Sequence, residues 1–174
     1  ATATIPAGTL QLRYRGEGQL LVDTATMRPT ATWKGHGLRL DLATMLLAMR
    51  PAFVRFPGGC YVEGGDKLAD AFRWQRTLGP LHERPGHDNA NWGYWSSDGL
   101  GYHEYLQLCE DLGALPMFVA NCGMSHQEVV PMDQLQPWID EALAAIEYAN
   151  GDATTTWGAR RAAAGHPLPF GLRY

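Results

Sequence analysis

The sequence predicts an α/β fold: a partial (β/α)8 TIM barrel, with about three of the eight β/α units, preceded by a short β segment. Short apolar stretches alternate with amphipathic helical stretches, as in parallel β/α arrays. The stretch 117–120 is apolar throughout, which is typical of a parallel strand covered on both faces. A closed barrel needs about 250 residues, and the chain has 174. A small open α/β sheet is the alternative.

Residues 1–30 are expected to be the end of a preceding β-rich segment, with strands over 10–14 and 19–23. Residues 31–174 then form the N-terminal part of the barrel. Its first unit has a helix over 38–49, ended by Pro51, and a strand over 52–56. That helix carries an apolar stripe on one side: Leu38, Leu42, Met45, Leu46, Met49.

A loop over 57–99 separates this strand from a second helix over 100–112 and a strand over 117–120. Loops longer than about 15 residues are usually functional or disordered, and this one is rich in Trp and Tyr. We therefore expect this long loop to have a function and not to be disordered.

A third helix is expected over 133–150, capped by Asp133 and ended by Gly151. A short helix over 157–164 and the start of a strand over 170–174 complete the pattern. The residues of the third helix expected to face inward are Leu135, Ile139, Leu143 and Ile146.

Composition excludes several classes of partner. The net charge is −4 and the basic residues are scattered, so there is no basic stripe to follow a nucleic acid. No apolar run approaches the roughly 20 residues that span a bilayer. The N-terminus lacks the basic start and apolar core of a secretion signal and has no initiator Met. We therefore expect neither a nucleic acid nor a membrane as partner.

Cysteine and histidine spacing gives no metal or disulfide signature. Three cysteines do not make a disulfide framework. Cys109 falls in a helical stretch and is expected in the core, whereas Cys60 and Cys122 each follow a predicted strand and could lie near a site. The six histidines form no His-x-x-x-His or His-x-His pair, so no zinc site is predicted.

The segment 55–65 places polar groups at the carboxyl end of a predicted strand, where β/α folds build binding sites. Aromatic side chains of the following loop suit sugar rings, which pack on π faces while their hydroxyls form hydrogen bonds. Arg55, Asn121 and Glu63 could supply those hydrogen bonds. The alternative is that the aromatic residues only fasten a long loop to the barrel. These loop residues are Trp74, His82, His87, Trp92, Tyr94 and Trp95.

From about Leu20 onward the chain resembles glycoside hydrolase family 51, the α-L-arabinofuranosidases. The resemblance runs through many ordered segments, among them Thr32-Trp33-Lys34-Gly35, Arg55-Phe56-Pro57-Gly58-Gly59-Cys60, Gly79-Pro80, Glu83-Arg84, Asp98-Gly99-Leu100-Gly101-Tyr102-His103-Glu104-Tyr105, Cys109-Glu110-Asp111-Leu112-Gly113-Ala114, Asn121-Cys122-Gly123-Met124 and Pro169-Phe170-Gly171-Leu172-Arg173-Tyr174. It implies a (β/α)8 barrel with an attached β-sandwich and retaining hydrolysis of terminal arabinofuranose by two glutamates, without a cofactor.

The resemblance implies that neither catalytic glutamate is in this chain. The acid/base, in a Gly-Asn-Glu motif, is expected just after Tyr174, the nucleophile further on, and a substrate-binding Glu before Ala1. The chain is expected to be truncated at both ends and inactive alone. The glutamates that are present are not expected to be catalytic. Glu104 suits the first turn of a helix, and Glu83 is expected to pair with Arg84.

Five residues are carried over as substrate-binding candidates. Arg55 matches the strand-end arginine that supports the sugar subsite, and Cys60 matches a position that contacts the bound arabinose. Asn121 ends the next strand and faces the same rim. Trp92 and Trp95 are candidates for the entrance of the pocket.

Three functions follow as alternatives. The favoured one is a fragment of an α-L-arabinofuranosidase that acts on arabinose-containing oligo- or polysaccharides. The second is another retaining barrel glycosidase, such as a xylosidase or endoglucanase. The third is a non-catalytic carbohydrate-binding or decayed module. The resemblance leaves open a homo-oligomeric full-length enzyme and a secreted, periplasmic or cytoplasmic location.

Overall fold

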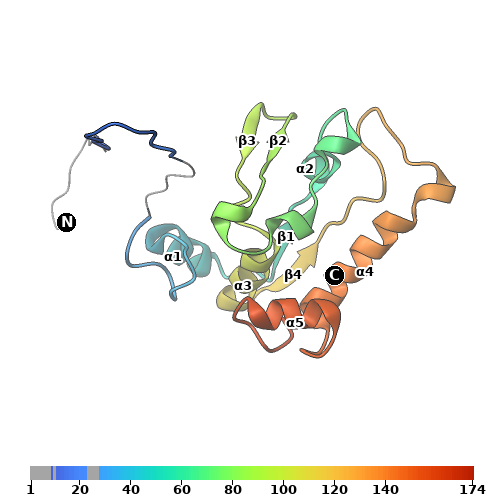
Figure 1. Cartoon of the computed structure of the whole chain (residues 1–174). Helices are drawn as coiled ribbons and strands as arrows, with labels where there is room; N and C mark the ends of the chain where they lie inside the picture. Colours follow the sequence, from blue (N-terminus) through green and yellow to red (C-terminus); the bar gives the residue numbers. More distant parts are fainter. Residues whose placement is uncertain (1–8, 10, 23–27) are drawn as a thin grey trace.

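Two parallel strands, β1 (Phe53–Phe56) and β4 (Leu115–Phe118), lie at the centre of the fold in the computed structural model, which describes residues 9, 11–22 and 28–174 (Figure 1). Phe53 pairs with Leu115 and Phe56 with Phe118. The two strands expected in this region are thereby confirmed, although β4 begins earlier than the apolar run suggested.

The predicted helices are also present. They are α1 (Leu40–Met49), α3 (Tyr102–Leu112), α4 (Gln136–Asn150) and α5 (Thr156–Ala163). Gly113 ends α3 at a φ of 68°, a left-handed conformation that favours glycine. In the part of the chain that the structure describes, no helix is both long and apolar enough to cross a membrane.

The start of α4 differs from the expectation. Leu135 is the N-cap residue, and Asp133 lies in the preceding 3-10 turn η4 (Met132–Gln134) instead of capping the helix. Proline in the first turn of α4 has no backbone N–H to leave unpaired, so Pro137 fits where the helix begins.

The core consists of two clusters of buried residues, one with many aromatic side chains and one mainly aliphatic. The first cluster contains Phe56, Phe72, Trp74, Tyr102, Leu106, Cys109, Ala144, Ala145, Tyr148 and Ala149. The second contains Trp33, Ala43, Leu108, Leu112 and Ala114. Cys109 is fully buried, which confirms its expected place in the core.

The prediction of which side of α4 faces the core is wrong. Ile139, Leu143 and Ile146 are about half exposed, whereas Ala145 and Tyr148 are buried. Small alanines let the helix approach the bulky rings of the aromatic cluster closely. The alanine face is therefore buried, and the more apolar face is not. Of the stripe expected on α1, Leu42, Met45, Leu46 and Met49 are likewise exposed, and Ala43 is that helix's buried residue. Leu38 lies before α1 and is half-buried against the second cluster.

Three expected strands did not form. Of the stretches 10–14 and 19–23, the described residues 11–14 and 19–22 have no strand structure, and residues 10 and 23 lie outside the described part. The stretch 170–174 has no ladder either, although the Tyr174 carbonyl accepts a 2.8 Å hydrogen bond from the Phe118 N–H. A strand needs a partner strand to pair its backbone groups, and sequence patterns alone do not supply one.

The expected loop over 57–99 is an ordered insertion. It contains the short helix α2 (Gly59–Glu63), the antiparallel hairpin of β2 (His87–Asn89) and β3 (Tyr94–Ser96), and three 3-10 turns. These turns are η1 (Leu68–Asp70), η2 (Trp74–Thr77) and η3 (Leu81–Glu83). Figure 1 shows α2 and the hairpin at the same end of the molecule, beyond the carboxyl end of β1.

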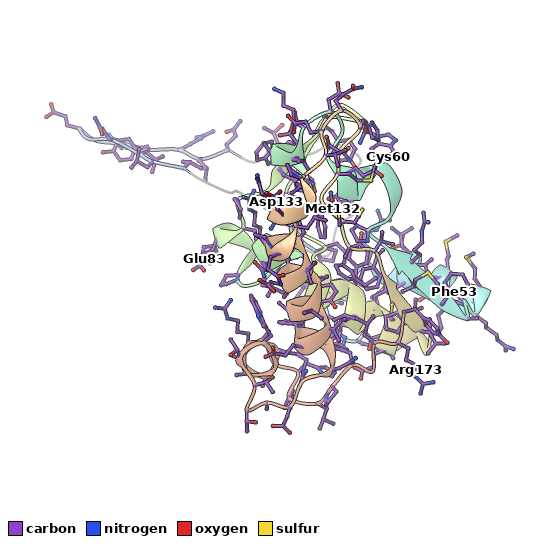
Figure 2. The ribbon with its side chains drawn as sticks, turned by 90° about the vertical axis from the view of Figure 1, so that its right-hand side faces the viewer. Phe53, Cys60, Glu83, Met132, Asp133 and Arg173 are labelled. Carbon is purple, nitrogen blue, oxygen red and sulfur yellow. The ribbon has the colours of Figure 1, made fainter. Side chains whose placement is uncertain are left out.

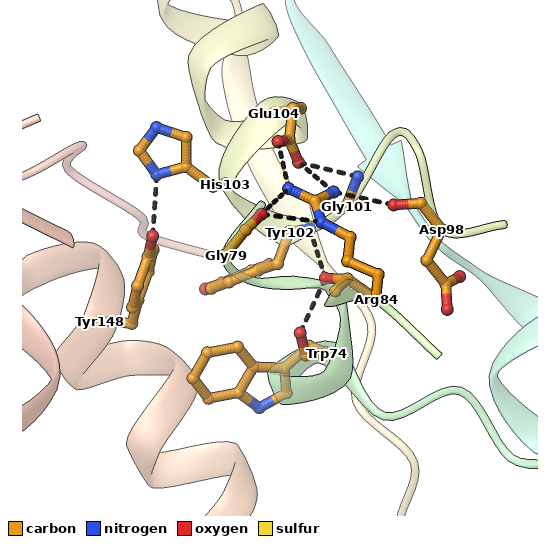
Figure 3. A network of polar contacts seen from close by, with 10 residues as sticks. Trp74, Gly79, Arg84, Asp98, Gly101, Tyr102, His103, Glu104 and Tyr148 are labelled. Carbon is orange, nitrogen blue, oxygen red and sulfur yellow. Dashed lines mark hydrogen bonds and ion pairs between the residues drawn. The ribbon is translucent and has the colours of Figure 1, made fainter. Parts of the chain in front are cut away.

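Arg84 joins this insertion to α3, and its partner is not the one expected. Its guanidinium binds Glu104 at 2.6 Å and the Gly79 and Asp98 carbonyls, as Figure 3 shows. Glu104 also accepts a hydrogen bond from the Gly101 N–H and so closes the first turn of α3. Glu83 instead lies 3.7 Å from Nε2 of His82, so the expected pair with Arg84 is wrong.

His103 gives the fold an acid-sensitive point. Its Nδ1 lies 2.8 Å from the Tyr148 hydroxyl (Figure 3), and burial lowers the pKa of its imidazole from the ordinary 6.5. Because the unfolded chain then binds the proton more tightly, stability is complete above about pH 6.5 and falls as the pH drops from there through the folded pKa. In the unaltered chain, His103 should lower the free energy of unfolding by about 1 kcal/mol or less for each pH unit of acidification in this range, and we expect His103→Gln to abolish that contribution.

Urea unfolding at pH 7.5 and 5.5 measures this difference. His82→Gln is the matched control, because His82 is exposed. An equal loss of stability on acidification in His103→Gln and in the unaltered chain would contradict the assignment.

Candidate functional site

The turn after β1 brings backbone and an arginine side chain close together. Gly58 has a φ of 89°, and a Cβ there would come 3.2 Å from Nε and Nη2 of Arg55. Further on, Gly64 ends α2 at a φ of 78°, and a Cβ there would lie 2.3 Å from the Ala71 nitrogen. Glycine is therefore required sterically at Gly64, and the close approach fixes α2 against the η1 segment.

An open cavity of about 790 Å³ lies between this turn and the hairpin. Four of the five substrate-binding candidates line it: Arg55, Cys60, Trp92 and Trp95. Arg55 comes from β1, Cys60 from α2, and the tryptophans from the β2–β3 hairpin. Residues that are distant in sequence thus meet at the carboxyl end of a central strand.

The aromatic residues of the insertion divide into two groups. Trp74 is 2% exposed and packs against Tyr102, with ring centroids 5.0 Å apart. Trp92 and Trp95, in contrast, are 59% and 65% exposed at the cavity. Trp74 therefore fastens the insertion to the core, whereas Trp92 and Trp95 offer flat apolar faces to solvent, and their contact with a sugar stays a prediction.

A partly buried polar network supports the base of the hairpin, and sequence reasoning missed it. Asp98 lies 3.1 Å from Nδ1 of His87 and accepts a 3.2 Å hydrogen bond from Ser96. The Ser96 hydroxyl is in turn 3.0 Å from that of Tyr61 on α2. Burial raises the pKa of Tyr61 to about 12, so the phenol remains protonated and able to donate. These residues follow no regular spacing that could have revealed them.

Asn121 stands apart from the other four candidates. It lines a separate cavity of about 90 Å³ that shares Gly59 with the larger one. Its amide donates to the Val62 and Met124 carbonyls, and its oxygen accepts from the Gly123 N–H at 2.7 Å. In this conformation the side chain ties the segment after β4 to α2.

Comparisons with known proteins agree on one family. The family model described as the α-L-arabinofuranosidase 1 domain matches residues 45–174. α-L-Arabinofuranosidase 1 of Arabidopsis thaliana is 48% identical over 174 residues, which are all of this chain and 26% of that protein. The extracellular exo-α-L-arabinofuranosidase of Streptomyces chartreusis is 38% identical, over 99% of this chain and 23% of its own length. The chain thus spans about a quarter of the length of the curated relatives it matches.

Solved structures show the same relationship. An arabinose-bound α-L-arabinofuranosidase of glycoside hydrolase family 51 superimposes with a TM-score of 0.75 at 42% identity, over 82% of this chain and 23% of its own. The arabinose complex of the Thermotoga maritima α-L-arabinofuranosidase gives 0.64 at 26% identity, over 80% and 25%. The α/β fold seen here corresponds to the N-terminal region of such a TIM-barrel enzyme.

Proposed function

This chain belongs to glycoside hydrolase family 51, the α-L-arabinofuranosidases, and we propose that it is the sugar-binding front part of such a retaining enzyme. The reaction is the release of terminal non-reducing α-L-arabinofuranosyl residues from arabinose-containing polysaccharides or oligosaccharides. Within the proposal, β1 and β4 are two of the eight barrel strands, and residues 1–30 end a preceding β-rich segment.

The cavity beside the hairpin is the observation that carries this proposal. A sugar offers hydroxyls to hydrogen-bonding groups and C–H faces to aromatic rings, and this cavity presents both kinds of partner. Arg55 is the donor to ring hydroxyls, Cys60 contacts the bound sugar, and Trp92 and Trp95 flank the entrance. Asn121 holds the neighbouring wall through the backbone contacts described above.

The chemistry of retention needs two carboxyl groups about 5–5.5 Å apart. In the proposal this chain supplies the binding surface, and the nucleophile and the acid/base carboxyl groups belong to the rest of the barrel. No cofactor takes part, because carboxylates and water suffice for the two displacement steps.

A chimeric enzyme tests the proposal. Residues 1–174 replace the matching segment of the Arabidopsis thaliana relative, and hydrolysis is measured on a panel of 4-nitrophenyl glycosides. We expect activity on the α-L-arabinofuranoside. Preference for a xyloside or glucoside would instead favour another barrel glycosidase, and a folded chimera that binds arabinose oligosaccharides without hydrolysis would favour a binding module.

Variants of the chimera then locate the sugar site. Losing a hydrogen bond from a charged donor costs about 1.5–3 kcal/mol, so Arg55→Ala should lower kcat/KM about 10- to 100-fold. Trp95→Ala removes an aromatic face and should lower it by up to about tenfold. Trp138→Ala is the control, because Trp138 lies against Arg73 and away from this cavity. Equal losses in all three variants would contradict the assignment of the site.

A further inference from the structure

Three metal-ligating side chains meet beside the sugar cavity, although nothing in their sequence spacing predicts it. The Sγ of Cys60, a carboxylate oxygen of Glu63 and a ring nitrogen of His126 all lie within 4.8 Å of one another. Cys60 and Glu63 come from α2, and His126 comes from the segment between β4 and α4. Figure 2 shows Cys60 beyond the strand that begins at Phe53, on the side away from Glu83.

The local backbone brings these groups together in a defined way. Cys60 and Glu63 are three residues apart on one helical turn, so they share a face of α2. The His126 N–H donates to the Gly65 carbonyl at 2.8 Å, and the Ser125 hydroxyl donates to the Asp66 carbonyl at 2.8 Å. The segment that carries the histidine is thereby tied to the chain just after α2.

The chemistry of this set is that of a zinc ligand shell. Zinc is bound by thiolate at about 2.3 Å, and by imidazole or carboxylate at about 2.0–2.2 Å, in tetrahedral geometry. Nε2 of His126 is already 2.9 Å from Glu63, and both side chains are about one-third exposed, so they have room to turn toward a shared ion. Three protein ligands leave the fourth position to water.

We propose that Cys60, Glu63 and His126 form a binding site for a thiophilic divalent cation of the zinc type. A mixed sulfur, nitrogen and oxygen set favours zinc over magnesium or calcium, which prefer oxygen ligands alone. The site goes beyond the proposed glycosidase function, because neither the hydrolytic reaction nor the sugar subsite requires an ion. Since Cys60 also lines the larger cavity, an ion bound there occupies one wall of the proposed sugar site.

Cobalt titration of the reduced, purified chain is the direct test. Co²⁺ substitutes for zinc and gives a thiolate-to-metal charge-transfer absorption that reports a cysteine ligand. We expect one equivalent of Co²⁺ to bind with this absorption and to be displaced by Zn²⁺. Cys60→Ser should abolish the absorption. Zn²⁺ affinity should fall in Cys60→Ser, Glu63→Gln and His126→Asn by at least the roughly 10- to 100-fold that the loss of an outer-shell partner costs.

Two matched controls make the result decisive. Cys122 is also an exposed, free cysteine, but it is outside the cluster, so Cys122→Ser should leave stoichiometry, absorption and affinity unchanged. His82→Asn does the same for the histidine. Failure of the unaltered chain to bind Co²⁺ or Zn²⁺ stoichiometrically would overturn the proposal, as would equal loss in Cys122→Ser. Neither result bears on the chimera, whose readout is glycoside hydrolysis.

Discussion

Replacing Arg161 by methionine should lower the free energy of unfolding by about 3–5 kcal/mol. The arginine is fully buried on α5. Its guanidinium donates to the carbonyls of Tyr148 at 2.8 Å, His166 at 3.0 Å and Pro167 at 3.1 Å. Methionine fills much of the volume but donates nothing, so the buried bond to the Tyr148 carbonyl and the two partly buried bonds are lost together. A buried carbonyl left without a donor costs about 1–3 kcal/mol. The side chain thus joins α4, α5 and the turn that follows α5.

Urea unfolding followed by far-ultraviolet circular dichroism measures the effect. Arg160→Met is the control, because Arg160 is exposed and its guanidinium lies 4.3 Å from the Trp157 ring. Loss of an exposed cation–π contact costs only about 0.5–1 kcal/mol. Comparable losses in the two variants would show that the three carbonyl contacts are not what stabilises this end of the fold.

Trp74→Ala should destabilise the fold to a similar extent, by about 3–5 kcal/mol. The indole packs against Tyr148 and Trp157 with ring centroids 5.7 and 4.9 Å apart, and its Nε1–H donates to the Glu141 carbonyl at 3.0 Å. Removing it leaves a cavity at the meeting point of the insertion with α4 and α5, and the surrounding rings can relax only in part.

The same unfolding measurement provides its own comparison in Trp95→Ala. Trp95 is 65% exposed on the hairpin, and surface substitutions usually change stability by no more than about 0.5 kcal/mol. If Trp95→Ala were as destabilising as Trp74→Ala, the distinction between core and cavity tryptophans would be wrong. Trp74→Phe should recover part of the loss, because the ring is retained while the indole hydrogen bond is not.

The regular elements were predictable where local signals agree. Pro51 and Gly113 end helices through backbone chemistry that acts within a few residues. The apolar run at 117–120 indicates a strand that overlaps β4 at Met117 and Phe118, both of which are half-buried. The faces of α1 and α4 were not predictable in this way. Hydrophobicity favours Ile139 and Leu143, but the packing of small alanines against large rings decides which side is buried, and that depends on residues elsewhere in the chain.

The candidate site shows the same division. Arg55 and Cys60 belong to one short segment, so their common position could be read from the motif and from the resemblance to a family. The pairing of His87 with Asp98 exists because the insertion folds back on itself, and that of Glu63 with His126 exists because the segment between β4 and α4 lies against the insertion. Neither the spacing of these residues nor the composition of the chain predicts contacts between residues that are distant in sequence.

The long path between β1 and β4 has a consequence for the order of folding. The parallel pair joins Phe53 to Leu115, so the whole insertion and α3 lie within the loop that this pairing closes. Hairpins form in about 1–10 μs. Parallel pairing of distant segments is slower, because the entropy cost of closing the loop arises before the strand contacts form and compensate for it. The β2–β3 hairpin and α3 should therefore acquire structure first, and hydrogen exchange during refolding should show their amides protected before those of β1 and β4.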